Sequence, residues 1–284
     1  MKQQKLCLGL MESLGLPEVE QIRLMQETGF EGFFSGWNRG ADLNALRRVA
    51  DQTGMMYQSV HAPFGRVDAL WYEDDRTQDA IAELVQCVQA TAEAGVPIMV
   101  CHAFIGFDRN TPTPQGPGNF EPIIREAERL GVKVAFENTE GEAYLAALMQ
   151  HFASSGAVGF CWDAGHEKCY NDPRDMLALY GDRLLGTHLN DNLGVRDFGG
   201  TITWHDDLHL LPFDGINDWA EIARRLNDCG FDGPLTFELT RGSKPNRHDN
   251  DAYARMDVRE YLALAYQRAC RVAALKRADL LRRG

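Results

Sequence analysis

The sequence predicts a single (β/α)8 TIM barrel, and three observations support this fold class. Short apolar or β-branched segments alternate with amphipathic segments along the whole chain, which is typical of repeated β-α units around a parallel sheet. Eight such units fill the 284 residues with little to spare, and barrels of this class have roughly 250 residues plus insertions. No linker divides the chain, so we expect residues 1–284 to form one domain.

Residues that start or stop helices bound the first four units. Asp42 is a predicted N-cap and Gly54 a predicted stop signal for the second helix. The segment TPTPQGPGNF (111–120) contains three prolines and predicts a long loop before the fourth helix. The predicted pairs are strand 5–10 with helix 17–29, strand 32–36 with helix 42–54, strand 55–63 with helix 78–94, and strand 97–104 with helix 121–131.

The second half of the chain continues the pattern, and each strand follows a helix or turn that ends in glycine. A long connector, 192–215, follows the seventh strand, and loops of this length in compact domains are usually functional. The last segment, 271–283, carries five basic residues and is expected to be a solvated final helix and tail. A doubly wound open sheet is the rival fold, but the segment 9–15 after the first strand is not the glycine-rich phosphate loop that it favours. The predicted strands are 132–138, 158–166, 184–191 and 233–240.

Composition and charge exclude several classes of protein. With 44% hydrophobic and 25% charged residues, the chain has an ordinary globular composition rather than a disordered one. Its 29 Lys and Arg against 41 Asp and Glu give a net charge of −12, which repels phosphate backbones and disfavours a nucleic-acid partner. No apolar run approaches the roughly 18 residues of a membrane span, and the start of the chain lacks a signal-peptide core, so we expect a cytoplasmic protein without a membrane partner. The oligomeric state stays open, a homo-oligomer included.

The seven cysteines do not suggest disulfides or a zinc knuckle. Their number is odd, and none forms a C-x-x-C pair. We expect most of them to be reduced and buried.

Acidic and imidazole side chains end six of the predicted strands. The active site of a TIM barrel is assembled at the C-terminal ends of its strands. Charged or imidazole groups beside apolar strand residues are costly unless they are paired or ligated, so this recurrence predicts a shared divalent cation. Any one of these residues alone could instead be a structural residue held by hydrogen bonds. The residues are His61, His102, Glu137, Asp163 with His166, His188 and Glu238, and the seventh connector adds Asp207 and His209.

The ligand types narrow the choice of metal without settling it. Carboxylates and imidazoles without a cysteine favour Mn²⁺, Mg²⁺, Co²⁺, Zn²⁺ or Fe²⁺. Aromatic residues near the strand ends can either form an apolar wall against a sugar or belong to the core. They are Phe34, Trp37, Phe64, Phe104 and Trp204.

Four strand-end residues carry a resemblance to a known family. Glu137, Asp163, His188 and Glu238, with the D-A-G-H spacing of Asp163 and His166, resemble the xylose isomerase-like barrel superfamily. Within it, HDDLHLLPFDGINDW (205–219) resembles the seventh-loop signature of the sugar phosphate isomerase/epimerase group. The resemblance covers nearly the whole chain and implies a metal held by these four residues.

The implied enzyme is a metal-dependent isomerase or epimerase of a small sugar or sugar phosphate. A proton next to a carbonyl becomes removable when a cation stabilises the enediolate, and two carboxylates flanking the carbon can exchange protons on its two faces. The resemblance assigns this acid/base role to Glu137 and Glu238. The candidate substrate-binding residues are His61, His102, His166, Arg196 and Arg241, the two arginines as anion-binding candidates. The Glu-x-Lys pattern of xylose isomerase proper is absent after Glu137.

An alternative enzyme within the superfamily has the same residue types. The trinuclear-zinc apurinic endonucleases bind three metals, and their pattern fits three groups in this chain, which suits phosphodiester hydrolysis. The net charge and the acidic connector, where Arg196 is the only basic residue, favour the sugar enzyme. A barrel that only binds a ligand would lack Glu137 or Glu238, and both are present. The three groups are His61, His102 and Glu137; Glu137, Asp163, His188 and Glu238; and His166, Asp207 and His209.

Overall fold

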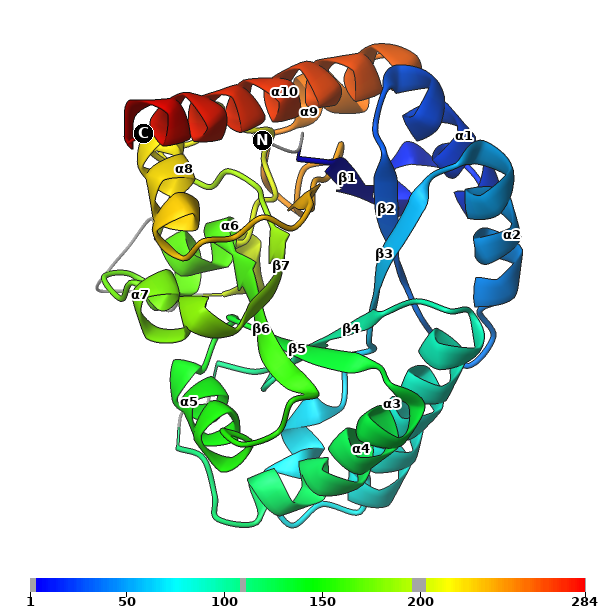
Figure 1. Cartoon of the computed structure of the whole chain (residues 1–284), viewed down its shortest axis with the longest axis vertical. Coiled ribbons are helices and arrows are strands. Elements are labelled where there is room, and N and C mark those ends of the chain that lie inside the picture. The colour runs from blue at the N-terminus through cyan, green and yellow to red at the C-terminus, as the bar shows by residue number, and fades with distance from the viewer. Residues whose placement is uncertain (1–3, 108–110, 196–202, 284) are drawn as a thin grey trace.

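The computed structural model describes residues 4–107, 111–195 and 203–283, and its eight strands form one parallel sheet. The sheet curls into a ring, and the helices lie outside it (Figure 1). Its strand order is β7-β6-β5-β4-β3-β2-β1-β8, so each strand lies beside its sequence neighbour. The strands are β1 (Leu6–Gly9), β2 (Gly32–Gly36), β3 (Met56–His61), β4 (Ile98–His102), β5 (Lys133–Glu137), β6 (Val158–Asp163), β7 (Leu184–His188) and β8 (Leu235–Phe237).

A seam between β7 and β8 completes the ring. Leu189 forms a single parallel bridge with Phe237, and its main-chain N–H donates to the Thr236 carbonyl at 2.8 Å. The Thr236 N–H donates to the Thr187 hydroxyl at 3.1 Å, where a regular parallel pair would use a main-chain carbonyl. The result is a nearly closed single-domain (β/α)8 barrel, which confirms the predicted fold class.

The helices follow the predicted units with two corrections. Asp42 caps its helix by accepting from the Ala45 N–H at 2.9 Å, and Gly54 ends it with a φ of 70°, as predicted. The predicted loop through residue 120 is wrong, because the helix already begins at Gly116; a proline in the first helical turn removes no needed donor. The helices are α1 (Glu18–Thr28), α2 (Leu43–Thr53), α3 (Thr77–Glu93), α4 (Gly116–Leu130), α5 (Glu142–His151), α6 (Ala164–His166), α7 (Met176–Tyr180), α8 (Trp219–Asp228), α9 (Asp251–Ala254) and α10 (Val258–Arg283).

The second correction concerns the basic C-terminal segment. It belongs to α10, as expected of a final helix, but not all of its basic side chains are solvated. Lys276 is buried, and its Nζ donates to the Phe231 carbonyl at 2.7 Å. This contact ties α10 to the segment that precedes β8.

The two-residue period of the strands positions the site. Val100, Ala135 and Cys161 form a small buried cluster separate from the main core between sheet and helices. Each lies two residues before a strand-end candidate, namely His102, Glu137 and Asp163. Because side chains two apart share a face of a strand, these three candidates lie above the interior layer of the barrel.

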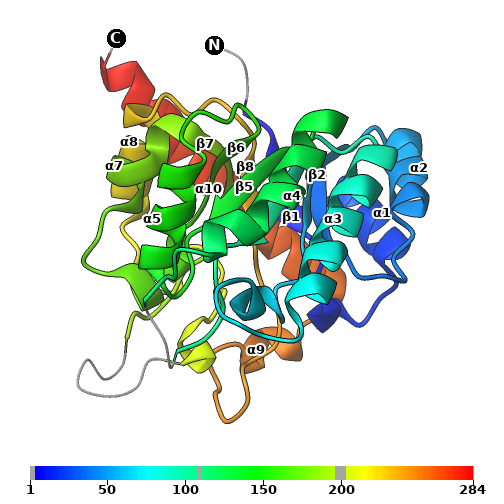
Figure 2. The ribbon, with the colours of Figure 1, turned by 90° about the horizontal axis from the view of Figure 1, so that it is seen from below.

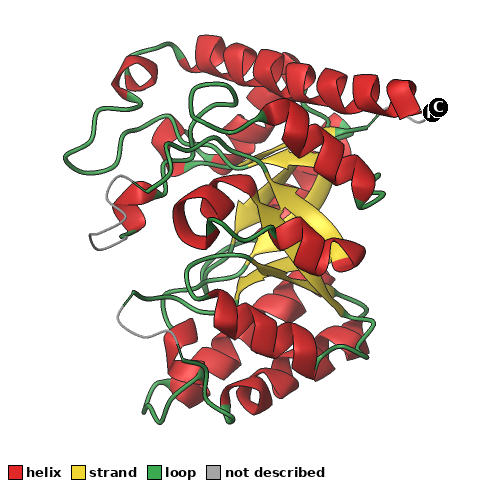
Figure 3. Cartoon of the chain, turned by 90° about the vertical axis from the view of Figure 1, so that its left-hand side faces the viewer, coloured by secondary structure: helices red, strands yellow, loops and turns green. Residues whose placement is uncertain are grey.

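The loops that follow the strand ends gather at one end of the molecule. Figure 2 shows α9 at the end opposite the two chain termini, and Figure 3 shows the strands enclosed by helices. Among the described residues, no helix is long and apolar enough to cross a membrane. All seven cysteines lie within the described ranges, none is in a disulfide, and five are buried.

Candidate functional site

One buried carboxylate at the end of β5 organises the site. Glu137 is fully buried, and four imidazoles surround it. Its Oε2 lies 3.2 Å from His61 Nε2 and 3.5 Å from His102 Nε2, and its Oε1 lies 3.0 Å from His188 Nδ1 and 3.5 Å from His166 Nδ1. Burial alone would raise the pKa of Glu137. The attraction of His188 and the hydrogen bonds from the surrounding histidines outweigh burial and hold the pKa of Glu137 well below its ordinary value. Glu137 is therefore an anion shared by several potential cations.

The ends of β5 to β8 supply a compact four-ligand group. One ligand atom from each of Glu137, Asp163, His188 and Glu238 lies within 4.8 Å of the others. Four donors about 2.1 Å from one ion would lie about 3.4 Å apart, so a small contraction of this group accommodates a divalent cation. The His188 Nδ1 lies 3.0 Å from both Glu137 and Glu238, which places the two carboxylates on either side of one ring nitrogen.

Two carboxyl groups of this four-ligand group differ in pKa. Burial raises the pKa of Asp163 to about 6. Burial also acts to raise the pKa of Glu238, but His188 and His209 outweigh it and bring the pKa to about 2. Glu238 is thus fully ionised at neutral pH.

The orientation of Asp163 is fixed by hydrogen bonds that the sequence analysis missed. The His166 N–H donates to its Oδ1 at 2.6 Å, and Asn190 Nδ2 donates to its Oδ2 at 2.8 Å. The Asn138 side chain accepts from the Asp163 N–H at 2.8 Å and donates to its carbonyl at 2.9 Å. Asn138 comes directly after the predicted ligand Glu137, and Asn190 comes two residues after His188. A polar residue so close to a predicted ligand was the sequence feature that could have identified them.

A glycine allows Asn190 to approach Asp163. A Cβ on Gly165 would lie 1.8 Å from the Asn190 Oδ1. We expect Gly165→Ala to displace Asn190 and to lower the free energy of unfolding by about 1–3 kcal/mol, as measured by denaturant unfolding. Gly156→Ala is the matched control, because a Cβ there meets nothing within 4 Å and its backbone is not in the left-handed region. Equal stability of the two variants would contradict the packing argument.

The other candidate ligands form two further groups next to the first. His61, His102 and Glu137 make one, and His166, Asp207 and His209 make the other. In the latter, Asp207 Oδ2 lies 2.8 Å from His209 Nε2 and 3.5 Å from His166 Nε2. The structure therefore brings all nine candidate ligands together, while their role as ligands stays a prediction.

The protonation of the imidazoles reflects these contacts. Burial lowers the pKa of His102, and the neighbouring Glu137 only partly offsets it. For His166, His188 and His209, burial acts in the same direction, but nearby carboxylates outweigh it and raise each pKa above its ordinary value.

The connector after β7 is held by another buried carboxylate, Asp191. It accepts from the Phe213 N–H at 2.9 Å, the Asn217 N–H at 3.0 Å and the Trp219 Nε1 at 2.8 Å. These bonds fix the part of the connector that carries His209. The sequence did not identify Lys244, whose Nζ lies 3.6 Å from Asp207 Oδ2. No motif around Lys244 indicates a role in the site.

A cavity of about 830 Å³ opens beside the four-ligand group. His61 and Glu238 lie on its wall, and Phe34, Trp37 and Phe64 supply aromatic surface. The Phe34 ring stacks on His188 and the Phe64 ring on His102, with centroid distances of 4.6 and 4.5 Å.

The remaining two aromatic candidates lie elsewhere. Phe104 belongs to the core, where it stacks on Tyr144 with a centroid distance of 3.9 Å. Trp204 is exposed and lies under the Lys244 ammonium.

Arg241, one of the two arginine candidates, is not among the described residues that line this cavity. Arg241 donates to the carbonyls of Ala254 and Met256, at 3.2 and 3.4 Å. Arg196 lies outside the described residues. Their role in substrate binding stays a prediction.

Comparison with known proteins agrees with this fold. An uncharacterized protein, y4fM, from Sinorhizobium fredii is 28% identical over 258 residues, covering 76% of this chain and 79% of its own. The structure of the IolI protein with a bound zinc atom superposes with a TM-score of 0.71 at 17% identity, covering 95% of this chain and 98% of that one. The 3-keto-D-glucoside 4-epimerase YcjR from E. coli superposes with a TM-score of 0.64 at 18% identity, covering 94% and 100%.

A model of a known protein family matches most of this chain. The model of the xylose isomerase-like TIM barrel matches residues 22–261, which is most of the chain and includes all nine candidate ligands. The chain therefore belongs to the xylose isomerase-like TIM barrel family.

Proposed function

We propose that this protein is a divalent-metal-dependent isomerase or epimerase of a small carbohydrate. One observation carries the proposal: the ligand atoms of Glu137, Asp163, His188 and Glu238 converge within 4.8 Å beside a cavity large enough for a sugar. The likeness to a zinc-containing structure and to a sugar epimerase supports it.

The donor set fits a divalent cation. Glu137, Asp163, His188 and Glu238 offer three carboxylates and one imidazole, a set suited to Mn²⁺, Zn²⁺, Co²⁺ or Mg²⁺. A cation held there supplies Lewis acidity, which polarises a substrate carbonyl and makes the neighbouring C–H proton acidic.

Glu238 is the group that would first take this proton. Its side chain is 22% exposed and lines the cavity, whereas Glu137 is fully buried. Because its pKa is about 2, it is ionised at neutral pH and has the unprotonated oxygen that a general base requires. Glu137, on the other side of His188 Nδ1, would serve as the second acid/base group. His61, which also lines the cavity, would contact the sugar.

The test combines metal content with proton exchange. Elemental analysis of the purified protein should find a divalent metal. Chelation should slow exchange of the α-proton of a ketose with D₂O by at least about 10³-fold, because metal polarisation of a carbonyl supplies several kcal/mol. Re-addition of Mn²⁺, Co²⁺ or Zn²⁺ should restore the rate. A protein that exchanges equally well with and without metal would contradict the proposal.

A multinuclear phosphodiesterase is the second candidate, and one observation favours it. The nine candidate ligands fall into three adjoining groups, which is the arrangement that clustered metals need. Cleavage of abasic DNA by the metal-loaded protein, without proton exchange into sugars, would favour this candidate over the isomerase.

A further inference from the structure

Resting on the proposed function, we infer that the substrate is an uncharged sugar, without a phosphate or carboxylate on the part that fills the 830 Å³ cavity. The charges on the cavity wall carry this inference. The ionisable lining residues other than His61 are all acidic: Glu12, Glu18, Asp42 and Glu238. Among the described residues, no lysine or arginine lines this cavity. Phosphate groups in proteins are recognised by Arg and Lys side chains or by free main-chain N–H groups.

Carboxylates of the protein lie at both helix N-termini next to the cavity. The N-terminus of α2 is capped by Asp42, which accepts from the Ala45 N–H. The N-terminus of α1 follows Pro17, which has no N–H, and its first turn carries Glu18 and Glu20. A phosphate at α2 would compete with Asp42 for the main-chain donor, and a phosphate at α1 would be repelled by Glu18 and Glu20 in the first turn of that helix.

The cavity also disfavours an added negative charge. Partial burial raises the pKa of Glu18, so even the protein's own anion is less stable there than in water. Arg48 lies 3.6 Å from Asp42 and is mostly exposed, so it balances a charge that is already present. A phosphate would add to the charges of Glu12 and Glu18.

The same wall suits a neutral polyol. Carboxylates accept hydrogen bonds from hydroxyl groups, which a sugar has in number. Phe34, Trp37 and Phe64 offer apolar surface for the C–H face of a sugar ring. The described residues of the wall therefore combine acceptors with aromatic surface and include no lysine or arginine that would pair with an anion.

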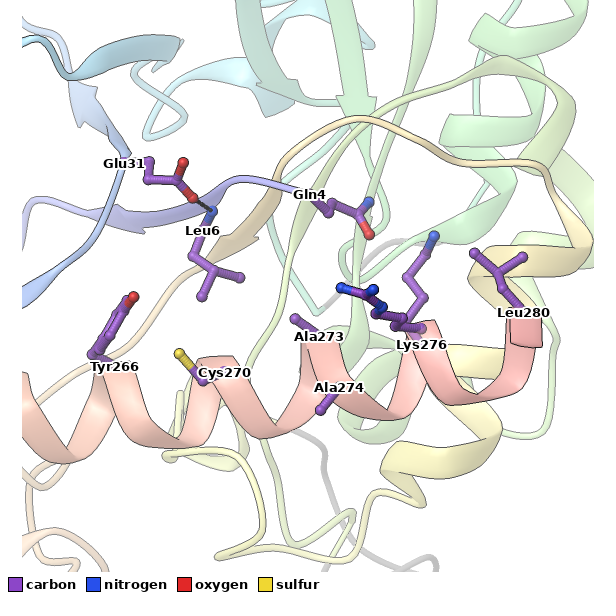
Figure 4. A pocket seen from close by; sticks show the side chains of 10 residues that line it. Gln4, Leu6, Glu31, Tyr266, Cys270, Ala273, Ala274, Lys276 and Leu280 are labelled. Atoms are coloured by element: carbon purple, nitrogen blue, oxygen red, sulfur yellow. Dashed lines mark hydrogen bonds between the residues drawn. The ribbon is translucent and has the colours of Figure 1, made fainter. Parts of the chain in front are cut away.

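Several basic side chains of the described chain line another cavity or contact other groups. Lys276 and Arg277 line a separate cavity of about 370 Å³ between α10 and the start of β1, at the opposite end of that strand from the site (Figure 4). Lys244 pairs with Asp207, and Arg241 donates to main-chain carbonyls.

The test compares sugars with their phosphate esters on the metal-loaded protein. We expect kcat/KM for α-proton exchange in D₂O to be at least about 100-fold higher for free ketohexoses than for their 1- and 6-phosphates, because like charges brought together in a site are strongly disfavoured. The double variant Glu12→Gln, Glu18→Gln should raise the ratio of ester to free-sugar kcat/KM by about tenfold, since it removes two of the repelling charges. Glu20→Gln is the matched control, because Glu20 lies on α1 but not on the cavity wall.

The outcomes separate this inference from the proposed function. Faster exchange with an ester than with its free sugar would overturn the inference and leave the isomerase proposal standing, and loss of that exchange in Arg196→Ala would identify the anion site. Exchange with neither class would contradict the proposed function. In that case calorimetry with sorbitol and sorbitol 6-phosphate still decides the inference: tighter binding of the phosphate overturns it, and tighter binding of sorbitol supports it.

Discussion

Replacing Glu238 by glutamine is expected to lower kcat for proton exchange by roughly 10²–10⁴-fold, the contribution of a positioned general base. Of the four ligands, Glu238 is the one that lines the cavity. It is ionised because His188 and His209 hold its pKa at about 2. The amide has nearly the same shape but cannot accept the proton. Steady-state exchange rates, together with a thermal melt to check the fold, measure the effect.

Two comparisons make the Glu238 result specific. Glu20→Gln, on the exposed side of α1, removes one carboxylate outside the cavity and should leave kcat within about twofold. An unchanged kcat in Glu238→Gln would remove Glu238 from the mechanism. A rise in KM with constant kcat would instead make it a binding residue.

Replacing Glu137 by glutamine is expected to abolish high-affinity metal binding and to destabilise the metal-free protein by about 3–5 kcal/mol, as for other broken buried ion pairs. Glu137 belongs to two of the ligand groups and contacts four imidazoles. The amide leaves His166 and His188, whose pKa values are raised, without their shared anion. Elemental analysis after metal loading measures the first effect, and denaturant unfolding of the chelated protein measures the second.

The control for Glu137 lies three residues further along the chain. Glu140 accepts from the Gly106 N–H at 2.9 Å and belongs to none of the ligand groups. A glutamine at residue 140 keeps an acceptor, so Glu140→Gln should bind metal as the wild type does. Wild-type metal content in Glu137→Gln would show that the site is organised around a different residue.

The sequence predicts most of this site because two regularities are strong. The strand period of two, together with the rule that parallel barrels place their C-terminal strand ends at one rim, brings His102, Glu137 and Asp163 to the same level. The register agrees, since His102 pairs with Glu137 and Asp163 with His188.

Other features depend on tertiary contacts that no local pattern encodes. The early start of α4 allows Phe120 to be buried against Trp71 and Phe136, and only two prolines, Pro112 and Pro114, precede the helix. The approach of Asn190 to Asp163 depends on contact between residues 27 apart. The cavity arises from loops of separate units, so its acidic wall could not be read from any one segment.

The seam between β7 and β8 links the chemistry of this protein to its resistance to local opening. The ring is joined there by one bridge and one threonine hydroxyl, and His188 and Glu238 stand on its two sides. A metal ion bound by both residues would cross-link β7 and β8 at this seam. Amide hydrogens beside the seam, such as those of Leu189 and Glu238, would then exchange more slowly in the metal-loaded protein, because each opening would require the ion to leave first.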